Sequence, residues 1–147
     1  MLDTMSATFC EVEVDTETGE VEITHWAAAH DVGKAIRPSS IEGQIENQLI
    51  FSTGLFKTEE YIWDKKTGVL LNGNDIDYKM PTIMDVAPMD PIIVETRLGN
   101  GCYGGSGVYH TVLDHGLWAC AVQNAIGKWI CEVPITPDKV LKALGKI

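Results

Sequence analysis

The sequence has little positive charge. Its 147 residues include 11 lysines and arginines against 21 aspartates and glutamates, which gives a formal net charge of −10. Nucleic acids and anionic membrane surfaces attract basic protein faces, so this balance argues against either as the main partner. The chain length and the 45% hydrophobic content instead favour one globular domain with a buried core.

Paired cysteines and long apolar runs are also absent from the sequence. The cysteines are Cys10, Cys102, Cys120 and Cys131. They form no CxxC pair, which argues against a zinc cluster and against a small disulfide scaffold. A metal site that combines them with His25 and His30 lacks ligand spacing. No apolar run approaches the roughly 18 residues of a membrane span, and the N-terminus has no signal pattern. We therefore expect reduced, mostly buried thiols in a protein that is cytoplasmic, or exported only with a partner.

The first third of the chain has the pattern of a β-hairpin. Apolar and polar residues alternate over residues 5–14, residues 15–19 have the composition of a tight loop, and the β pattern resumes over residues 21–29. The second strand ends at His30 and Asp31, where strand gives way to loop. Such a pair is structural more often than catalytic, because aspartate readily accepts hydrogen bonds from nearby backbone N–H groups.

A long helix is predicted to start near Ser40. Ser39 and Glu42, three residues apart, have the pattern of a capping box. A buried stripe at helical spacing follows, with Ile41, Ile45, Leu49 and Phe56. Gly43 and Gly54 interrupt this helix, and each costs up to about 1 kcal/mol relative to alanine. Their presence indicates that something packs close to the helix backbone.

The remaining patterns predict further strands and two more helices. Strands are expected at residues 59–64, 69–72, 92–96 and 129–133. A second long helix is expected over residues 112–126, and Thr136 and Pro137 begin a short final helix that ends near Gly145. Together these elements predict one α+β domain, residues 1–147, with a mixed or antiparallel sheet, two long helices and a short C-terminal helix.

Residues 99–107 are the stretch most typical of a ligand contact. Five of these residues are glycine, so the backbone can adopt positive φ and approach another molecule closely. If the loop opens the helix over residues 112–126, its N–H groups and the helix dipole converge on an anion. A flexible surface hairpin is an equally weighted alternative, because the spacing fits no dinucleotide-binding or P-loop motif.

Glutamate is missing after this loop. None occurs between Gly107 and Glu132, and Asp114 is the one carboxylate in that interval. Two histidines, His110 and His115, stand near the predicted helix start, where either titrates near neutrality unless it serves in capping or packing.

Four segments carry a resemblance to a known family. They are residues 30–46 with Thr58-Glu59-Glu60, residues 70–82, residues 103–108, and residues 124–141. In order, spacing and content they resemble the C-terminal end of the molybdenum-cofactor-binding subunit of the xanthine dehydrogenase and aldehyde oxidoreductase family. The resemblance extends over nearly the whole chain.

The resemblance implies a subunit that binds molybdopterin, often as its cytosine dinucleotide, and hydroxylates aldehydes or N-heterocycles with oxygen taken from water. It places two segments beside this anionic cofactor, namely Gly43 with Gln44, and the run Gly104, Gly105, Ser106, Gly107 and Val108. The implied partners are the remaining lobes of the molybdenum subunit, together with FAD and iron–sulfur subunits.

The sequence departs from the family pattern at the general base. Where the family loop continues to a catalytic glutamate, Tyr109 replaces a glycine and His110 falls on the glutamate position, while Ser106 stands where lysine is frequent. His110, or Asp114 if burial raises its pKa, is then the candidate proton acceptor. A changed or absent activity is the alternative.

The chain is also short for this family, whose cofactor subunits run to several hundred residues. We expect a split subunit, a truncated product or a fragment, with no molybdopterin bound and no activity when isolated. The alternative is a non-catalytic remnant that binds a partner chain or a small anion.

Overall fold

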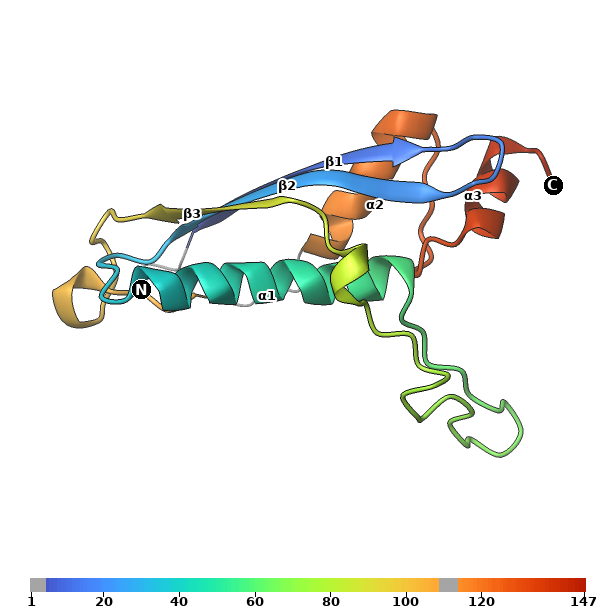
Figure 1. The fold of residues 1–147 in the computed structure, drawn as a ribbon, viewed down its shortest axis with the longest axis horizontal. Helices are drawn as coiled ribbons and strands as arrows, with labels where there is room; N and C mark the ends of the chain where they lie inside the picture. Colours follow the sequence, from blue (N-terminus) through green and yellow to red (C-terminus); the bar gives the residue numbers. More distant parts are fainter. Residues whose placement is uncertain (1–4, 109–113) are drawn as a thin grey trace.

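The computed structural model describes residues 5–108 and 114–147 of the chain. Its elements are β1 (Ser6–Val14), β2 (Val21–Asp31), α1 (Pro38–Lys57), the 3-10 helix η1 (Ile83–Asp85), β3 (Met89–Val94), the 3-10 helix η2 (Cys102–Gly104), α2 (Asp114–Ile126) and α3 (Pro137–Leu144). The strands form one sheet in the order β1–β2–β3, with β1 antiparallel and β3 parallel to β2. Figure 1 shows α1 running along this sheet. The predicted α+β class with a mixed sheet is confirmed.

The hairpin of β1 and β2 contains one β-bulge. The register shifts between Glu11 and Val12, so that Thr24 is an extra residue in β2. A bulge reverses which residues face the core beyond it. The buried positions of β2 accordingly change from odd to even numbers, being Val21, Ile23, Trp26, Ala28 and His30. One face of β2 is thereby kept on the core along its whole length.

The core lies between the sheet and the long helices. Trp118 of α2 is fully buried, and its ring meets that of Trp26 edge-on, with centroids 4.3 Å apart. The Phe56 ring stacks on Trp118 with a centroid distance of 5.1 Å. Ile45 and Leu49, which precede Phe56 along the predicted stripe of α1, are also buried. These aromatic contacts join the sheet, α1 and α2 in one cluster.

The helix ends are partly as predicted. The capping box of Ser39 and Glu42 is wrong, because Arg37 is the N-cap and Pro38 occupies the first turn, which places Ser39 inside the helix. Proline suits this position, because N–H groups in the first turn of a helix have no acceptor within the helix and proline therefore loses no hydrogen bond there. For α3, the predicted Thr136 N-cap and the left-handed Gly145 that ends the helix, with φ 73°, are confirmed.

Two predicted strand regions are wrong. Residues 129–133 form no strand and are not part of the β1–β2–β3 sheet; Trp129 is exposed and Ile130 is buried. Residues 59–64 and 69–72 form only an isolated bridge between Trp63 and Leu70. A two-stranded ribbon is marginal without a third strand or a helix to cover it.

The edge strand β3 starts at Met89, three residues before the predicted start. It contains Pro91, which is tolerated because an edge strand leaves one side of its backbone unpaired. The end of α2 at Ile126 agrees with the prediction, whereas the predicted start at residue 112 lies outside the described residues.

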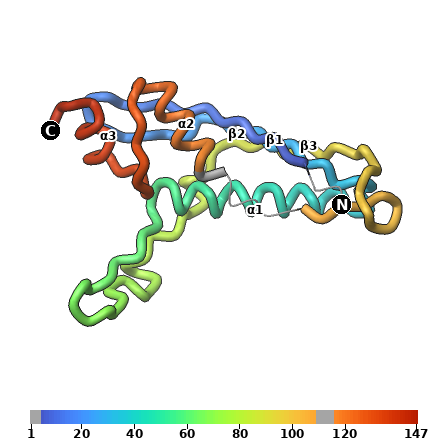
Figure 2. Tube along the Cα trace, turned by 180° about the vertical axis from the view of Figure 1, so that it is seen from behind, coloured from blue at the N-terminus to red at the C-terminus, as the bar shows by residue number. Residues whose placement is uncertain are grey.

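Residues 59–82 leave the body of the molecule as an extended arm, which is visible in Figure 1 and, from behind, in Figure 2. We call this segment the arm. It begins after the end of α1 and returns to the body at η1.

None of the helices in the described part combines the length and apolar character that a bilayer crossing requires.

The expectation of mostly buried thiols is wrong. Cys102, Cys120 and Cys131 are exposed, and Cys10 is partly buried against the core cluster. Cysteine spacing in the sequence carries no information on which side of a helix or loop each thiol will face.

Candidate functional site

The ends of β2 and β3 meet the glycine loop, residues 99–107, at the end of the molecule where α1 begins (Figures 1 and 2). Because β2 and β3 are parallel, their carboxyl ends coincide, and Asp31 pairs with Val94. The strands stay joined beyond this pair, since the Val32 N–H donates to the Val94 carbonyl at 3.0 Å. The loops that follow both strands therefore start side by side.

Asp31 fixes the turn after β2. Its Oδ1 accepts hydrogen bonds from the backbone N–H of Gly33 at 3.1 Å and of Thr96 at 3.2 Å. The Thr96 hydroxyl also donates to Oδ2. The Thr96 hydroxyl, followed by the Gly33 N–H, holds the pKa of Asp31 below its usual range. A carboxylate held in this way favours the structural interpretation of the His30–Asp31 pair.

The glycine loop is ordered by its own backbone. The Gly99 N–H donates to the Gly104 carbonyl at 3.0 Å, and the Gly101 N–H donates to the Gly105 carbonyl at 2.9 Å. Ser106 ties the loop to the strand end, with its N–H on the Val32 carbonyl and its hydroxyl on the Asp31 carbonyl at 2.9 Å. These hydrogen bonds favour a loop with one defined conformation over the alternative of a flexible surface hairpin.

Gly33 lies directly against this loop. It has φ +69°, and a Cβ at this position would lie 1.9 Å from the Gly104 carbonyl oxygen. Gly104 in turn has φ +71°, and its Cβ would lie 2.3 Å from the Arg97 carbonyl oxygen. Glycine is required at both positions for conformation and for space. The sequence includes Gly33 in the segment that resembles the family but indicates no role for it, although its place two residues after the strand-end carboxylate of Asp31 is a usable signal.

The predicted cofactor-contacting residues fall into two groups. Gly104, Gly105 and Ser106 hold the loop together, and Val108 packs against the core cluster. Three others are exposed at the surface, namely Gly43, Gln44 and Gly107.

Gly43 and Gly54 differ in what packs against them. A Cβ on Gly54 would lie 2.2 Å from the Glu59 carboxylate, so the expected close packing occurs at that end of α1. A Cβ on Gly43 would meet none of the described residues within 4 Å. Within the described residues, then, no group of this chain approaches the α1 backbone at Gly43.

A basic hollow adjoins the glycine loop. It has a volume of about 410 Å³ and is lined by Lys34, Arg97, Tyr103 and Gly104. Arg97 and Tyr103 both have φ 60°, which is uncommon for residues other than glycine. The Lys34 ammonium lies 3.1 Å from the Glu95 carboxylate, and the Ala35 N–H followed by Lys34 lowers the pKa of Glu95. Lys34 and Arg97 thus bring two cations to this hollow, with the carboxylates of Glu95 and Asp31 close by, because Asp31 is hydrogen-bonded to Gly33 and Thr96.

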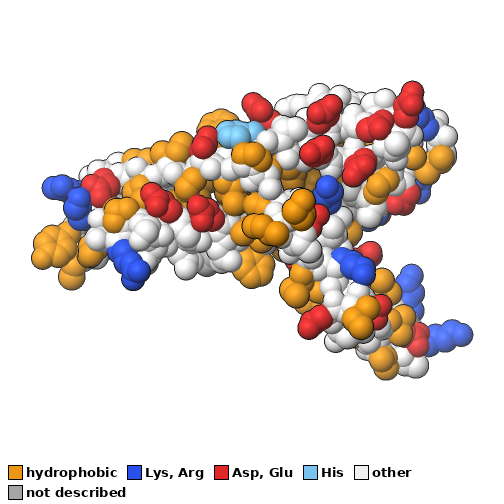
Figure 3. All heavy atoms as spheres, viewed as in Figure 1, with side chains coloured by type: hydrophobic (Ala, Val, Ile, Leu, Met, Phe, Trp, Pro, Cys, Tyr) orange, Lys and Arg blue, Asp and Glu red, His pale blue; other side chains and the backbone are white. Residues whose placement is uncertain are grey.

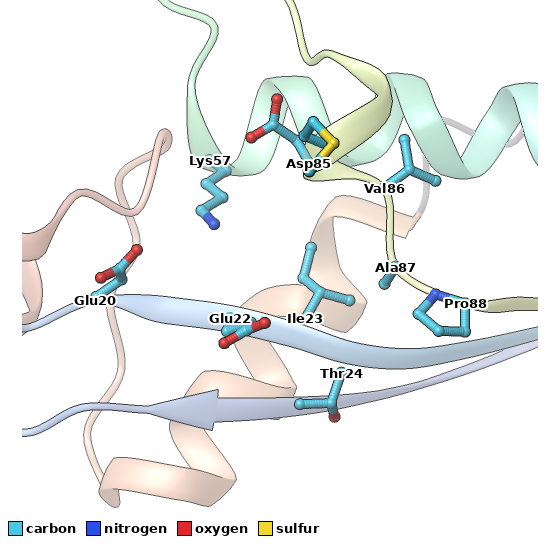
Figure 4. A pocket seen from close by; sticks show the side chains of 10 residues that line it. Glu20, Glu22, Ile23, Thr24, Lys57, Asp85, Val86, Ala87 and Pro88 are labelled. Atoms are coloured by element: carbon cyan, nitrogen blue, oxygen red, sulfur yellow. The ribbon is translucent and has the colours of Figure 1, made fainter.

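A second hollow, shown in Figure 4, lies at the other end of α1. Its volume is about 430 Å³, and Lys57 extends into it from the end of α1 toward Glu22 on β2. Asp85 lies nearby, with a pKa lowered by the N–H and hydroxyl of Thr82 and, less strongly, by Lys57. The other lining residues are Glu20, Ile23, Thr24, Met84, Val86, Ala87 and Pro88. None of the predicted site residues lies here.

Neither candidate base has a described side chain. His110 lies outside the described residues, and Asp114 is the first residue of α2 with a side chain outside the described part. Among residues 5–108 and 114–147, no three histidine, cysteine or carboxylate side chains are grouped as ligands for a metal ion.

The α+β fold, with its three-stranded mixed sheet and its helices, is the fold of molybdenum-cofactor-binding domains. Residues 3–87 match the family of the molybdopterin cofactor-binding domain, and the chain belongs to this family. Its relatives over most of the chain are molybdenum-binding subunits of the xanthine dehydrogenase and aldehyde oxidoreductase type.

Three comparisons give the extent of this similarity. The chain is 31% identical over 137 residues to the xanthine dehydrogenase molybdenum-binding subunit of Escherichia coli O157:H7, which aligns with 90% of this chain. Quinoline 2-oxidoreductase from Pseudomonas putida 86 matches 92% of the chain with a TM-score of 0.81 and 28% identity. Aldehyde oxidoreductase from Desulfovibrio gigas matches 97% with a TM-score of 0.84 and 25% identity. The chain spans 18%, 18% and 15% of these three proteins, respectively.

Proposed function

We propose that the chain forms one wall of the cofactor site in a molybdenum hydroxylase, with Gly43, Gln44 and Gly107 in contact with molybdopterin. The observation that carries this proposal is the open space at Gly43, where an added Cβ would meet none of the described residues within 4 Å. Gly43 is an expensive residue in a helix interior unless something approaches the backbone closely. The exposed Gln44 carboxamide beside it offers both a donor and an acceptor to a pterin ring.

Charge supports the same proposal. Molybdopterin is anionic, and the basic hollow with Lys34 and Arg97 adjoins the glycine loop of a chain that is otherwise strongly acidic. We propose that Gly104, Gly105, Ser106 and Val108 act by holding the loop. We further propose that the cofactor is the cytosine dinucleotide form, whose additional phosphate the two cations would favour.

The proposed reaction is the hydroxylation of an aldehyde or an N-heterocycle with oxygen from water. The cofactor, when bound, supplies the two-electron oxidation. His110 accepts a proton from the reacting water, with Asp114 as the second candidate. FAD and iron–sulfur partners in the cytoplasm would accept the two electrons. The isolated chain is proposed to be inactive and free of cofactor, because its share of the relatives' length is 15–18%.

A chimeric subunit tests this function. The segment of the Escherichia coli O157:H7 subunit that matches this chain is replaced by the chain itself, and the purified chimera is assayed for molybdenum and pterin. We expect both to be retained. Gly43→Leu should lose most of the molybdenum, since the side chain fills the space of approach. Ala125→Leu adds bulk at an exposed position of α2 and serves as the matched control.

The second candidate function is a non-catalytic remnant that binds a partner chain or a small anion. The missing glutamate between Gly107 and Glu132 favours it. A folded chimera without molybdenum would support the remnant, whereas equal molybdenum in Gly43→Leu and Ala125→Leu would remove Gly43 from the cofactor contact.

A further inference from the structure

The arm, residues 59–82, presents apolar side chains to solvent. Seven large hydrophobic residues in it are 48–79% exposed, among them Trp63 at 55%, Leu71 at 58% and Ile76 at 79%. Figure 3 shows hydrophobic atoms spread over the projecting arm, next to charged ones. Seven large exposed hydrophobic residues gathered on one short projection indicate an interaction site, whereas single ones scattered over a surface would not.

The arm does not use these side chains to cover the core. Its root packs on α1, where a Cβ on Gly54 would meet Glu59 and the Pro81 ring within 3 Å. Beyond this root the arm stands away from the sheet and helices in both ribbon views. Its apolar residues therefore have no role in the packing of the body.

The arm is nevertheless built to keep one shape. Asn72 is 6% exposed, and its side chain donates to the Glu60 carbonyl at 2.6 Å and accepts from the Ile62 N–H at 2.9 Å. The Tyr78 hydroxyl donates to the Glu59 carboxylate at 2.8 Å, and the rings of Tyr78 and Tyr61 lie 5.2 Å apart. A segment ordered in advance loses little conformational entropy when it binds.

The arm belongs to the shared fold. The aldehyde oxidoreductase structure matches 97% of the chain at a TM-score of 0.84. The unmatched 3% of 147 residues is about four residues, far fewer than the arm contains. The match therefore runs across the arm, in a protein more than five times as long as this chain.

We infer that the arm is the docking surface for the remaining part of the molybdenum-binding subunit, whether that part is a separate chain or another segment of the same one. The argument for this occupant is length, because the chain spans 18% of the Escherichia coli subunit and the match to the aldehyde oxidoreductase structure runs across the arm. The inference rests on the proposed function and names the surface through which the two parts of the site are joined.

The test uses the 147-residue chain and, as probe, the Escherichia coli O157:H7 subunit without the segment that matches it. Association is measured by analytical ultracentrifugation, and side-chain protection by hydroxyl-radical footprinting. We expect a complex in which Trp63 and Met80 are protected. Ile76→Glu should weaken association at least ten-fold. Ile147→Glu, the same change at a residue that is 73% exposed outside the arm, should leave it unchanged.

The possible outcomes distinguish a failure of the docking inference from a failure of the proposed function. A complex that leaves the arm unprotected and tolerates both Ile76→Glu and Leu71→Glu overturns the docking inference and leaves the proposed function standing. Self-association of the chain through a protected arm also overturns it, in favour of a second copy. No complex, although the chimera holds molybdenum, counts against docking alone, whereas failure of both experiments overturns the proposed function.

Discussion

Gly33 is the residue on which the packing of the glycine loop depends most directly. Gly33→Ala places a Cβ in a left-handed backbone and 1.9 Å from the Gly104 carbonyl oxygen. We expect the free energy of unfolding in urea to fall by more than the roughly 1–2 kcal/mol that the left-handed conformation costs. Gly68→Ala is the matched control, because Gly68 has φ +71° and open space around its Cβ. Equal losses of unfolding free energy in both variants would show that the close contact between Gly33 and Gly104 does not contribute to the effect.

Asp31 gives the stability a pH dependence of known sign. The Thr96 hydroxyl and the Gly33 N–H hold its pKa below the unfolded value of about 3.9. The stabilisation is therefore present above the unfolded pKa and is lost as the pH falls through the lower folded pKa. We expect Asp31→Asn to lower the urea midpoint at pH 7 and to reduce its further fall between pH 5 and about pH 2. Thr96→Val should act in the same direction. A full acid-induced fall in Asp31→Asn would contradict this role.

His110 is tested in the molybdenum-loaded chimera. If it accepts the proton, His110→Ala should lower turnover by at least the roughly 100-fold contributed by a general base, with molybdenum content unchanged. Full turnover in this variant would assign the role to Asp114 or to a partner residue. A parallel loss of molybdenum would instead make His110 a residue of the binding site.

At the scale of elements, Trp118 joins α2 to the rest of the core. It is fully buried between the Trp26 and Phe56 rings. We expect Trp118→Ala to destabilise the chain by about 3–5 kcal/mol, as for other large aromatic residues removed from cores. Trp129→Ala removes the same side chain at a position that is 60% exposed and should cost far less. Thermal and urea unfolding followed by circular dichroism compare the two, and similar losses would refute the core assignment.

Elements whose signals lie in adjacent residues could be predicted from the sequence. Alternation gave the hairpin, and the Thr136-Pro137 start with the Gly145 end gave α3. The strands expected at residues 59–64 and 69–72 form only an isolated bridge, because no third strand or helix among the described residues covers this pair, and residues 129–133 form no strand.

The candidate site divides in the same way. The glycine loop and Gly43 could be recognised from local composition and from the family pattern. The basic hollow could not, because Lys34 and Arg97 are distant in sequence and meet only when parallel β2 and β3 end together. The close packing of Gly33 on Gly104 is likewise a consequence of the folded backbone.

At the scale of the whole molecule, the arm and the body differ in how they are held. The body encloses the aromatic core, whereas the arm relies on hydrogen bonds within a narrow ribbon. Exposed turns of this kind open at low free energy and are preferred sites of proteolysis. Lys65 and Lys66 are exposed in the turn that Asp64 closes by accepting the Lys66 N–H at 2.9 Å.

We therefore expect trypsin to cleave the isolated chain first after Lys65 or Lys66. The nicked chain should keep the helical circular dichroism and the thermal unfolding midpoint of the intact one, since the cut leaves the core contacts in place. Lys57, half-buried at the end of α1, and Lys142 within α3 should be cleaved later. The double variant Lys65→Gln, Lys66→Gln removes the first sites and should delay digestion. Mass spectrometry of the early fragments decides, because initial cleavage in α3 or loss of helicity on nicking would mean that the arm is part of the cooperative fold.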